Sequence, residues 1–277
     1  MVRVRYSFGS RHTGNLKNIR KQRQKYPKIV LDVIEISDII LEVLDARFIE
    51  ETRNLELEKL IREKGKKIIY VLNKADLINK EDIKKKIKIK PYVFISCTQR
   101  KGGFNLRNLI KRVINEIDLD GKKRAQVGII GYPNTGKSSL INFLTGRNVA
   151  KKGNEPGFTK GMQKVRLTQN ILILDTPGVI SNEDYSMYDN IKISKHAKIG
   201  SRSIGKIREP EVVIQNLLNE HKEKLEKSYE VKSKGDSEFF LEQVGKKKNY
   251  LTKGGEVDIT RTALQVIKEW QDGKFKF

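Results

Sequence analysis

Cysteine is nearly absent from this sequence, in which Cys97 is the only one among 277 residues. A lone thiol excludes a disulfide framework and any zinc site built from several cysteines. Apolar runs of the roughly 20 residues that a membrane-spanning helix requires are also missing. The first five residues, MVRVR, lack the apolar stretch of a signal peptide. We therefore expect a cytoplasmic protein without stable membrane association.

Acidic residues are scarce relative to basic ones. The chain has 34 Asp and Glu against 57 Lys and Arg, a formal net charge of +23. A charge of this size favours binding to polyanions, so nucleic acid is the first expected partner and an anionic membrane surface the second. Residues 1–28 form a basic N-terminal arm with nine Lys or Arg and no acid. The arm also contains Tyr6, Phe8 and Tyr26. Either these rings stack on bases while the cations contact phosphates, or they only attach a solvated N-terminal tail to the rest of the protein.

From residue 29 onwards, short apolar runs alternate with segments of helical spacing. Strands are expected at 39–45, 67–72, 92–95 and 125–130, with a hairpin at 165–167 and 171–174. Helices are expected at 29–36, 55–61, 106–117 and 137–144, and a lysine-rich helical segment extends to Lys90, before Pro91. This alternation predicts an α/β domain over 29–180, with a mostly parallel sheet and helices on both faces.

After residue 180 the pattern changes. Residues 181–208 are polar and interrupted by glycine, and no element is assigned to them. Helical spacing returns at about 210–229, 237–244 and 260–271. Residues 181–277 are therefore predicted to form a small C-terminal helical domain.

A phosphate-binding loop is the most specific motif in the chain. Residues 131–138, GYPNTGKS, match the G-x-x-x-x-G-K-[ST] pattern between a predicted strand and a predicted helix. Backbone N–H groups of such a loop surround phosphates, and the helix N-terminus adds positive potential. Lys137 would reach the β- and γ-phosphates, and the Ser138 hydroxyl would bind Mg²⁺. The residues assigned to phosphate binding are Asn134, Thr135, Gly136, Lys137, Ser138 and Ser139.

Two further segments complete the expected phosphate and metal site. Asp175-Thr176-Pro177-Gly178 follows an apolar strand, and a carboxylate there can hold Mg²⁺, usually through water. The Gly178 N–H is placed to contact a γ-phosphate. Thr159, in the polar loop between the two motifs, is expected to close over the metal. Without a related phosphate loop, Asp175 would only cap a turn.

The base specificity is carried by Asn73-Lys74-Ala75-Asp76. Asp76 can accept hydrogen bonds from the N1–H and the 2-amino group of guanine, which adenine cannot supply. Asn73 and the Lys74 stem would support and cover the ring. Ser96-Cys97-Thr98, at the end of the next predicted strand, fits a loop whose backbone N–H contacts the guanine oxygen. Together these motifs predict GTP and GDP, rather than ATP, as ligands.

The order of the motifs is rotated relative to ordinary GTPases, in which the phosphate loop comes first. Here the guanine motifs at 73–76 and 96–98 precede the phosphate loop, Thr159 and Asp175. The sequence therefore resembles the circularly permuted GTPases, and among them the ribosome-assembly group that includes bacterial YlqF/RbgA and eukaryotic large-subunit factors. The resemblance extends to residues 41–47, Arg53-Asn54 and residues 253–258. It is strong over 39–180 and loose elsewhere.

The resemblance implies a P-loop GTPase domain in permuted order, followed by a C-terminal domain that binds ribosomal RNA. Because of the permutation, the chain after Asp175 runs directly into the C-terminal domain. A γ-phosphate that orders this segment could therefore reposition the C-terminal domain. Lys246-Lys247-Lys248, Tyr250 and Lys253 form its most basic loop, which is either an RNA contact or a solvated surface.

The catalytic assignment is Lys137, Asn134, Thr159 and Gly178. Many GTPases orient water with a glutamine just after the Asp-x-x-Gly motif, where this chain has Val179. Slow intrinsic hydrolysis is therefore expected. Asn134 resembles the asparagine that binds K⁺ in potassium-dependent relatives, or simply stabilises the loop. His12 invites comparison with a histidine of the bacterial relatives, but its sequence context differs and its role stays open.

These features predict a Mg-dependent GTP-hydrolysing assembly factor that binds the large ribosomal subunit or its precursor through rRNA and is stimulated by that particle. K⁺ is a further candidate cofactor, and we expect a monomer. Two alternatives stay open from the sequence: an RNA-docking module in which GTP is a structural ligand, and a GTPase that acts at an anionic membrane surface.

Overall fold

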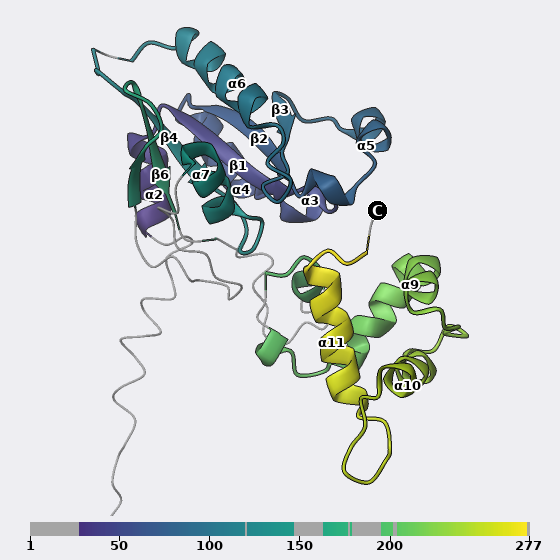
Figure 1. Ribbon diagram of the computed structural model, residues 1–277. Coiled ribbons are helices and arrows are strands. Elements are labelled where there is room, and N and C mark those ends of the chain that lie inside the picture. Colours follow the sequence, from purple (N-terminus) through teal and green to yellow (C-terminus); the bar gives the residue numbers. More distant parts are fainter. Residues whose placement is uncertain are drawn as a thin grey trace, which may run out of the picture.

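The structure is a computed structural model, and it describes residues 28–119, 121–146, 163–176, 178, 195–201 and 204–275. Thr159, Val179, His12 and the basic arm before residue 28 lie outside these ranges. Two packed regions are visible: a sheet unit formed by residues 28–146 and 163–176, and a helical unit formed by residues 195–275 (Figure 1). No helix in the described ranges is long and apolar enough to cross a membrane.

One six-stranded sheet forms the frame of the sheet unit, with the strand order β3-β2-β1-β4-β6-β5. All neighbouring strands are parallel except β5, which pairs antiparallel with β6 at the edge. The strands are β1 (Ile39–Asp45), β2 (Lys67–Asn73), β3 (Tyr92–Phe94), β4 (Ala125–Ile130), β5 (Gln163–Arg166) and β6 (Ile171–Asp175). This confirms the expected α/β fold with a mostly parallel sheet.

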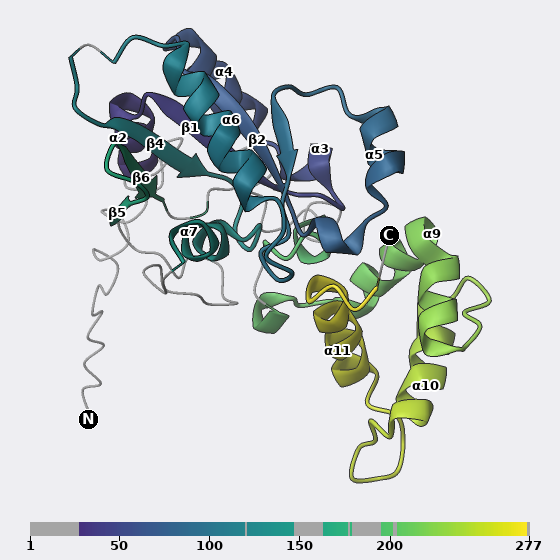
Figure 2. The same ribbon diagram turned by 45° about the horizontal axis from the view of Figure 1, so that its top comes forward.

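Helices cover both faces of the sheet, because side chains of the buried central strands alternate between them. Ile39, Leu41 and Val43 of β1 pack toward α6 (Gly103–Asn115) and α7 (Lys137–Thr145). Ile40 and Leu44 pack toward the other face, which α2 (Lys28–Ile36) and α4 (Leu55–Glu63) cover (Figure 2). Short α3 (Ile49–Thr52), the 3₁₀ turn η1 (Ala75–Leu77) and α5 (Lys80–Lys86) lie in the connections.

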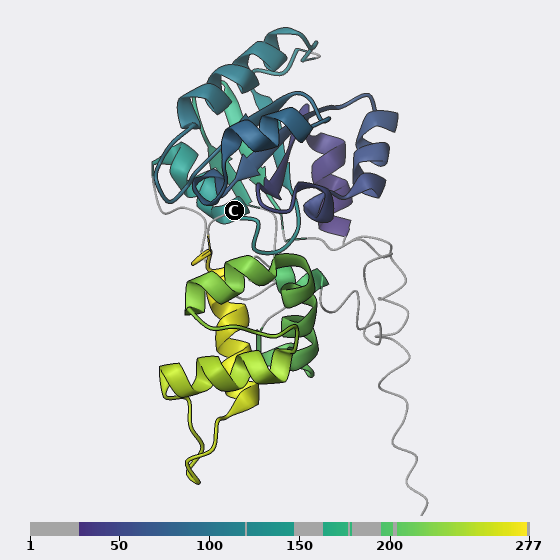
Figure 3. The same cartoon turned by 90° about the vertical axis from the view of Figure 1, so that its right-hand side faces the viewer.

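The helical unit has a core of its own. It contains the 3₁₀ turn η2 (Ile204–Lys206), α9 (Pro210–Tyr229), α10 (Ser237–Lys248) and α11 (Ile259–Gln271). The Asp258 side chain caps α11 by accepting a hydrogen bond from the Arg261 N–H. The apolar stripe of α11 ends in Trp270, which is fully buried. The helical unit lies against one end of the sheet unit (Figure 3).

The lysine-rich helix is shorter than expected. It ends at Lys86 rather than near Lys90, and Ile87 is extended. Proline disfavours helical geometry at the residue before it, here Lys90. Ile89 is buried, so these residues pack an extended segment on the core instead of continuing the helix.

Candidate nucleotide-binding site

The predicted guanine and phosphate motifs lie at one edge of the sheet. β1, β2, β4 and β6 run parallel, so their carboxyl ends meet there. Asn73 is the last residue of β2, Asp175 is the last residue of β6, and the loop 131–136 follows β4 directly. Segments that are distant and permuted in the sequence therefore share one edge.

The loop 131–136 is shaped by residues in the left-handed region. Gly131 has φ 143°, Asn134 has φ 61° and Gly136 has φ 98°. A Cβ atom on Gly136 would lie 2.1 Å from Nδ2 of Asn73, so only glycine fits beside that side chain. Nδ2 of Asn73 also donates to the backbone oxygen of Thr135 at 2.8 Å. One contact thus joins a guanine motif to the phosphate loop.

Lys137 and Asp175 form the phosphate end of the site, together with residues 131–136. The Nζ atom of Lys137 donates to the carbonyl oxygens of Gly131 at 3.0 Å and Tyr132 at 2.6 Å. Burial lowers the pKa of Lys137 to about 8, against the opposing attraction of Asp175. Burial raises the pKa of Asp175 to about 6, although the Lys137 charge acts to lower it. Both groups are therefore charged at a cost that a nearby phosphate or cation would relieve.

The surroundings of Asp175 leave room for a ligand. Its two carboxylate oxygens are buried and accept no hydrogen bond from the described residues. The next residue, Thr176, donates its hydroxyl to the Ile129 carbonyl at 2.7 Å, which fixes the chain after β6 on β4. A Cβ atom on Gly178 would lie 2.7 Å from Cα of Pro133 and 3.0 Å from Nζ of Lys137. Glycine is thus required where the chain approaches the phosphate loop.

Asn73–Asp76 and Ser96 form the guanine end of the site. The Ser96 hydroxyl donates to Oδ1 of Asp76 at 2.6 Å, and it accepts from the Gln99 N–H at 3.0 Å. Lys74 adopts the left-handed region with φ 61°. The two guanine motifs therefore lie together, with the Asp76 carboxylate held from one side.

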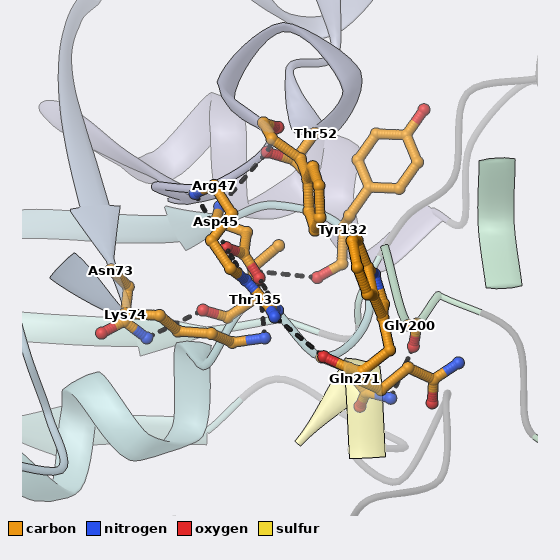
Figure 4. A network of polar contacts seen from close by, with 12 residues as sticks. Asp45, Arg47, Thr52, Asn73, Lys74, Tyr132, Thr135, Gly200 and Gln271 are labelled. Atoms are coloured by element: carbon orange, nitrogen blue, oxygen red, sulfur yellow. Dashed lines mark hydrogen bonds and ion pairs between the residues drawn. The ribbon is translucent and has the colours of Figure 1, made fainter. Parts of the chain in front are cut away.

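Asp45 and Arg47 are site residues to which the sequence assigned no role. The Lys74 ammonium lies 2.8 Å from Oδ2 of Asp45, and Arg47 donates to both oxygens of that carboxylate (Figure 4). Burial alone would raise the pKa of Asp45, but Lys74 and Arg47 outweigh it and hold that pKa well below its usual range. Asp45 is the last residue of the buried strand β1, at the same edge of the sheet as Asn73 and Asp175. A carboxylate at the end of an apolar run was the signal in the sequence that could have identified it.

Arg47 also reaches the helical unit. Its Nη1 donates to the Trp270 carbonyl oxygen at 2.9 Å, at the end of α11. The guanidinium lies 5.0 Å from the centroid of the Phe48 ring, which in turn stacks on Trp270 at 6.2 Å between centroids. The guanine end is therefore linked to α11 through Lys74, Asp45 and Arg47.

The phosphate loop contacts the helical unit separately. The Tyr132 ring is fully buried in the apolar core of that unit. Nδ2 of Asn134 donates to the Gly200 carbonyl at 2.7 Å, and Figure 4 shows Gly200 and Gln271 beside Tyr132. Two residues of the phosphate loop are thus built into the interface between the units.

The structure describes only some of the remaining predicted site residues. Ser138 and Ser139 are half-buried in the first turn of α7, and Cys97 is half-buried beside Ser96. Thr159 lies outside the described residues, as do Val179 and His12. Two histidines of the helical unit have packing positions: His196 is buried, and the centroid of the His221 ring lies 5.0 Å from that of Trp270.

Comparison with known proteins identifies relatives over most of the chain. Residues 126–241 match a sequence family described as "50S ribosome-binding GTPase". A GTP-binding protein of Methanocaldococcus jannaschii, itself named uncharacterized, is 45% identical over 265 residues, which cover 94% of this chain and 68% of that protein. "Nuclear/nucleolar GTPase 2" of Oryza sativa is 34% identical over 256 residues, covering 88% of this chain and 46% of the relative. This chain thus spans about half the length of the plant protein.

Two solved structures have the same fold. The GDP-bound structure of TM YlqF superposes with a TM-score of 0.61 at 25% identity, covering 90% of this chain and 97% of that one. GNP-bound YlqF from T. maritima gives a TM-score of 0.59 at 24% identity, covering 94% and 96%, and supports the fold alone. With guanine motifs ahead of the phosphate loop and both at one sheet edge, the chain belongs to the circularly permuted GTPases of the YlqF type and is a GTPase.

Proposed function

We propose that this GTPase is an assembly factor of the large ribosomal subunit or its precursor, which hydrolyses GTP slowly alone and faster on that particle. The observation that carries the proposal is the attachment of both ends of the nucleotide site to a separate helical unit, through Arg47 and Asn134. A site built into an interface in this way can couple nucleotide state to the placement of that unit. The descriptions of the matched family and of the nucleolar relative support a ribosomal partner.

The protein groups fit guanine nucleotide at named positions. Asp76 would accept hydrogen bonds from the guanine edge, and its hydrogen bond from Ser96 supports this orientation. The Lys137 ammonium, now shared between two backbone carbonyls, would move its hydrogen bonds to the β- and γ-phosphates. Gly178 would approach the γ-phosphate with its N–H, and Thr159 would close over the site.

Magnesium also fits the residues present. Among the described residues there is no group of three or more His, Cys, Asp or Glu that could hold a metal ion. Mg²⁺ in nucleotide sites needs only one or two carboxylates, because water, hydroxyl and phosphate oxygens supply the other ligands. The buried, unpartnered Asp175 carboxylate and the Ser138 hydroxyl suit that role, with Thr159 as the third protein group. Bound Mg²⁺ would neutralise charge that develops on the phosphates.

Slow intrinsic turnover follows from what the chain lacks after Gly178. Val179 cannot orient a water molecule, so we infer that charge and positioning come from elsewhere. Asn134 is the proposed K⁺ ligand. Its amide nitrogen donates to the Gly200 carbonyl, and its amide oxygen is the atom that would bind the cation.

Ribosomal RNA is the proposed partner of the helical unit. Lys246, Lys247 and Lys248 form the last turn of α10. All three lysines are exposed; Lys246 pairs with Glu242 and Lys247 pairs with Glu230. The three lysines predicted to lie in a loop are thus helical, and the basic loop of α10 comprises this last turn and the residues that follow it to Lys253. The guanidinium of Arg261 lies 5.4 Å from the ring centroid of Tyr250, which adds a cation and an aromatic ring to it. We propose that the protein acts as a cytoplasmic monomer.

The test is the rate of GTP hydrolysis with and without purified large ribosomal subunits, in potassium and in sodium buffer. We expect slow basal turnover and at least several-fold acceleration by large subunits in potassium. Small subunits at the same concentration control for general polyanion binding. Rates that respond to neither large subunits nor potassium would contradict the proposal, as would GTP that persists unhydrolysed on the subunit in a single turnover.

A further inference from the structure

The segment that extends from the last turn of α5 through β3 and α6 is strongly basic, whereas the first turn of α5 carries Glu81 and Asp82. Between residues 83 and 115 the chain carries ten Lys or Arg and no Asp or Glu. The cations are Lys84, Lys85, Lys86, Lys88, Lys90, Arg100, Lys101, Arg107, Lys111 and Arg112. Acidic residues resume at Glu116, after the last turn of α6. This segment belongs to the sheet unit. Apart from the guanine motif at 96–98, neither the motifs nor the proposed function assigned it a role.

Helix α6 presents these cations on one face. Leu106, Ile110 and Val113 are buried against the sheet. The opposite side, at helical spacing, is exposed and contains no acid. We call this side the α6 face; it consists of Phe104, Arg107, Asn108, Lys111, Arg112 and Asn115.

The cations of the α6 face have no acidic partner among the described residues. Arg107 donates to the Leu144 carbonyl, and Lys111 and Arg112 are exposed without an ion pair to any described residue. The neighbouring helix α7 has no Asp or Glu in its sequence KSSLINFLT. The nearest acid along the chain is the exposed Glu116, one turn after Arg112. The cations outnumber the acids here, which favours binding of a polyanion.

An exposed aromatic ring lies on the same face. The Phe104 side chain is 75% exposed, more than any other large apolar residue in the described ranges. Beside the start of α6, the Arg100 guanidinium lies 5.7 Å from the Phe143 ring centroid. An isolated ring among cations and amides offers a stacking platform for a base, not the apolar patch that a protein partner needs.

The α6 face is continuous with the guanine end of the site. Ser96 and Lys101 exchange backbone hydrogen bonds of 3.1 and 3.0 Å, which close a turn between the guanine motif and α6. Gly102 has φ 87°, and a Cβ atom there would lie 2.2 Å from the Phe94 carbonyl oxygen. In Figure 1, α6 lies in the upper part of the sheet unit and the helical unit lies below. A polyanion on α6 would thus bind apart from the basic loop of α10.

We propose that the α6 face is a second RNA-binding surface, on the GTPase side of the molecule. Arg107, Lys111 and Arg112 contact the phosphate backbone, and Phe104 stacks on an unpaired base. The asparagine amides of the same face donate to phosphate or sugar oxygens. This surface rests on the proposed function, since the RNA is that of the ribosomal particle. With the loop of α10, it gives the protein two separated RNA contacts.

The test compares a Lys111→Gln, Arg112→Gln double variant with a Lys59→Gln, Lys67→Gln control, in which two exposed lysines outside the α6 face lose the same charge. Binding to purified large subunits, and to a 20-nucleotide RNA hairpin with an unpaired loop, is measured from about 50 to 200 mM salt. We expect the α6 variant to bind about tenfold more weakly, with a salt slope smaller by about 1 to 2, and the control to match the wild type. Phe104→Ala should weaken hairpin binding about tenfold with an unchanged slope.

The outcomes separate the two proposals. If wild-type protein fails to bind large subunits, the proposed function fails. If the wild type binds and the α6 variant keeps its affinity and salt slope, the α6 surface is wrong. The α6 surface is also wrong if the variant loses binding to an acidic polyglutamate peptide but retains RNA. Binding of fluorescent GDP by every variant shows that the site remains folded.

Discussion

The two ends of the nucleotide site differ in how fully their polar groups are paired. At the guanine end, the Asp76 carboxylate accepts from Ser96, and the Lys74 ammonium lies against Asp45. Nδ2 of Asn73 donates to the phosphate loop, and only its buried Oδ1 has no partner among the described residues. These contacts hold the side chains that we propose select the base.

At the phosphate end, by contrast, the charges are poorly compensated. Neither Asp175 oxygen accepts a hydrogen bond from the described residues, and burial shifts the pKa values of both Asp175 and Lys137 toward their neutral forms. From this difference we infer that the fold alone positions the side chains proposed for base recognition, whereas the proposed phosphate end needs a ligand to balance its charges. Ligand and pH should therefore act mainly on the phosphate end.

The largest effect is expected from a substitution at the guanine end of the site. Asp76→Asn removes the charged acceptor for the guanine N1–H and amino group, and should weaken GDP binding about a thousandfold. The same variant should gain affinity for xanthosine nucleotides, whose base carries an oxygen in place of the amino group. Competition of GDP, XDP and ADP against fluorescent GDP measures both changes. Comparable binding of ATP and GTP by the wild type would overturn the assignment.

The second largest effect is expected from a substitution at the phosphate end of the site. Lys137→Ala removes the ammonium that would contact the β- and γ-phosphates, and should weaken GTP binding about a hundredfold. The control is Lys164→Ala, at an exposed lysine of β5. Circular dichroism of both variants should match the wild type. Unchanged GTP affinity in Lys137→Ala would show that the loop does not bind phosphate.

The third effect tests the link from the guanine end to the helical unit. Arg47→Ala removes hydrogen bonds to Asp45 and to the Trp270 carbonyl, and should cost about 2 kcal/mol of unfolding free energy. Trp270 is the only tryptophan, so its fluorescence reports directly on this contact. The matched control is Arg53→Ala, since Arg53 pairs with Glu58 inside the sheet unit. A fluorescence shift of the same size in both variants would contradict a specific link.

The fourth effect is a pH dependence confined to the phosphate end. The pKa of Asp175 is raised from 3.8 to about 6, so its protonated form favours folding below about pH 4, and this contribution is lost as the pH rises through 6. A cation needs the ionised form. Magnesium affinity in the presence of GDP should therefore fall about tenfold for each pH unit below 6. Asp175→Asn should bind Mg²⁺ weakly at every pH; a pH-independent wild type would argue against this role.

The smallest effect concerns Asn134. Asn134→Ala removes the hydrogen bond to Gly200 and the proposed K⁺ ligand. We expect the difference between hydrolysis rates in potassium and in sodium to shrink a few-fold, with GDP affinity nearly unchanged. Titrating both cations at constant ionic strength checks this. A variant that keeps the full potassium response would assign Asn134 to the interface alone.

Much of the fold could be predicted from the spacing of apolar residues and from the glycine and proline residues at which helices and strands end. The strands were identified from apolar runs. The loop 131–138 was identified from the G-x-x-x-x-G-K-[ST] pattern, which is specific for phosphate binding. Short connecting elements were missed, since α3 has four residues and carries too little periodicity to recognise. Helix α5 ends at Lys86, before the predicted end near Lys90, because Ile89 packs in the core. This is a tertiary contact that local propensity does not reveal.

The sequence by itself determined which chemical groups are available for guanine, phosphate and metal, because those groups come in short, contiguous motifs at strand ends. Only the tertiary structure decided what holds them. Gly136 must lack a side chain because Asn73 occupies its space, and Arg47 bridges Asp45 and Trp270 across 223 residues of chain. Such contacts depend on strand order and on packing between the units, and neither leaves a local pattern. Local patterns name the reacting groups, and packing sets their partners and charges.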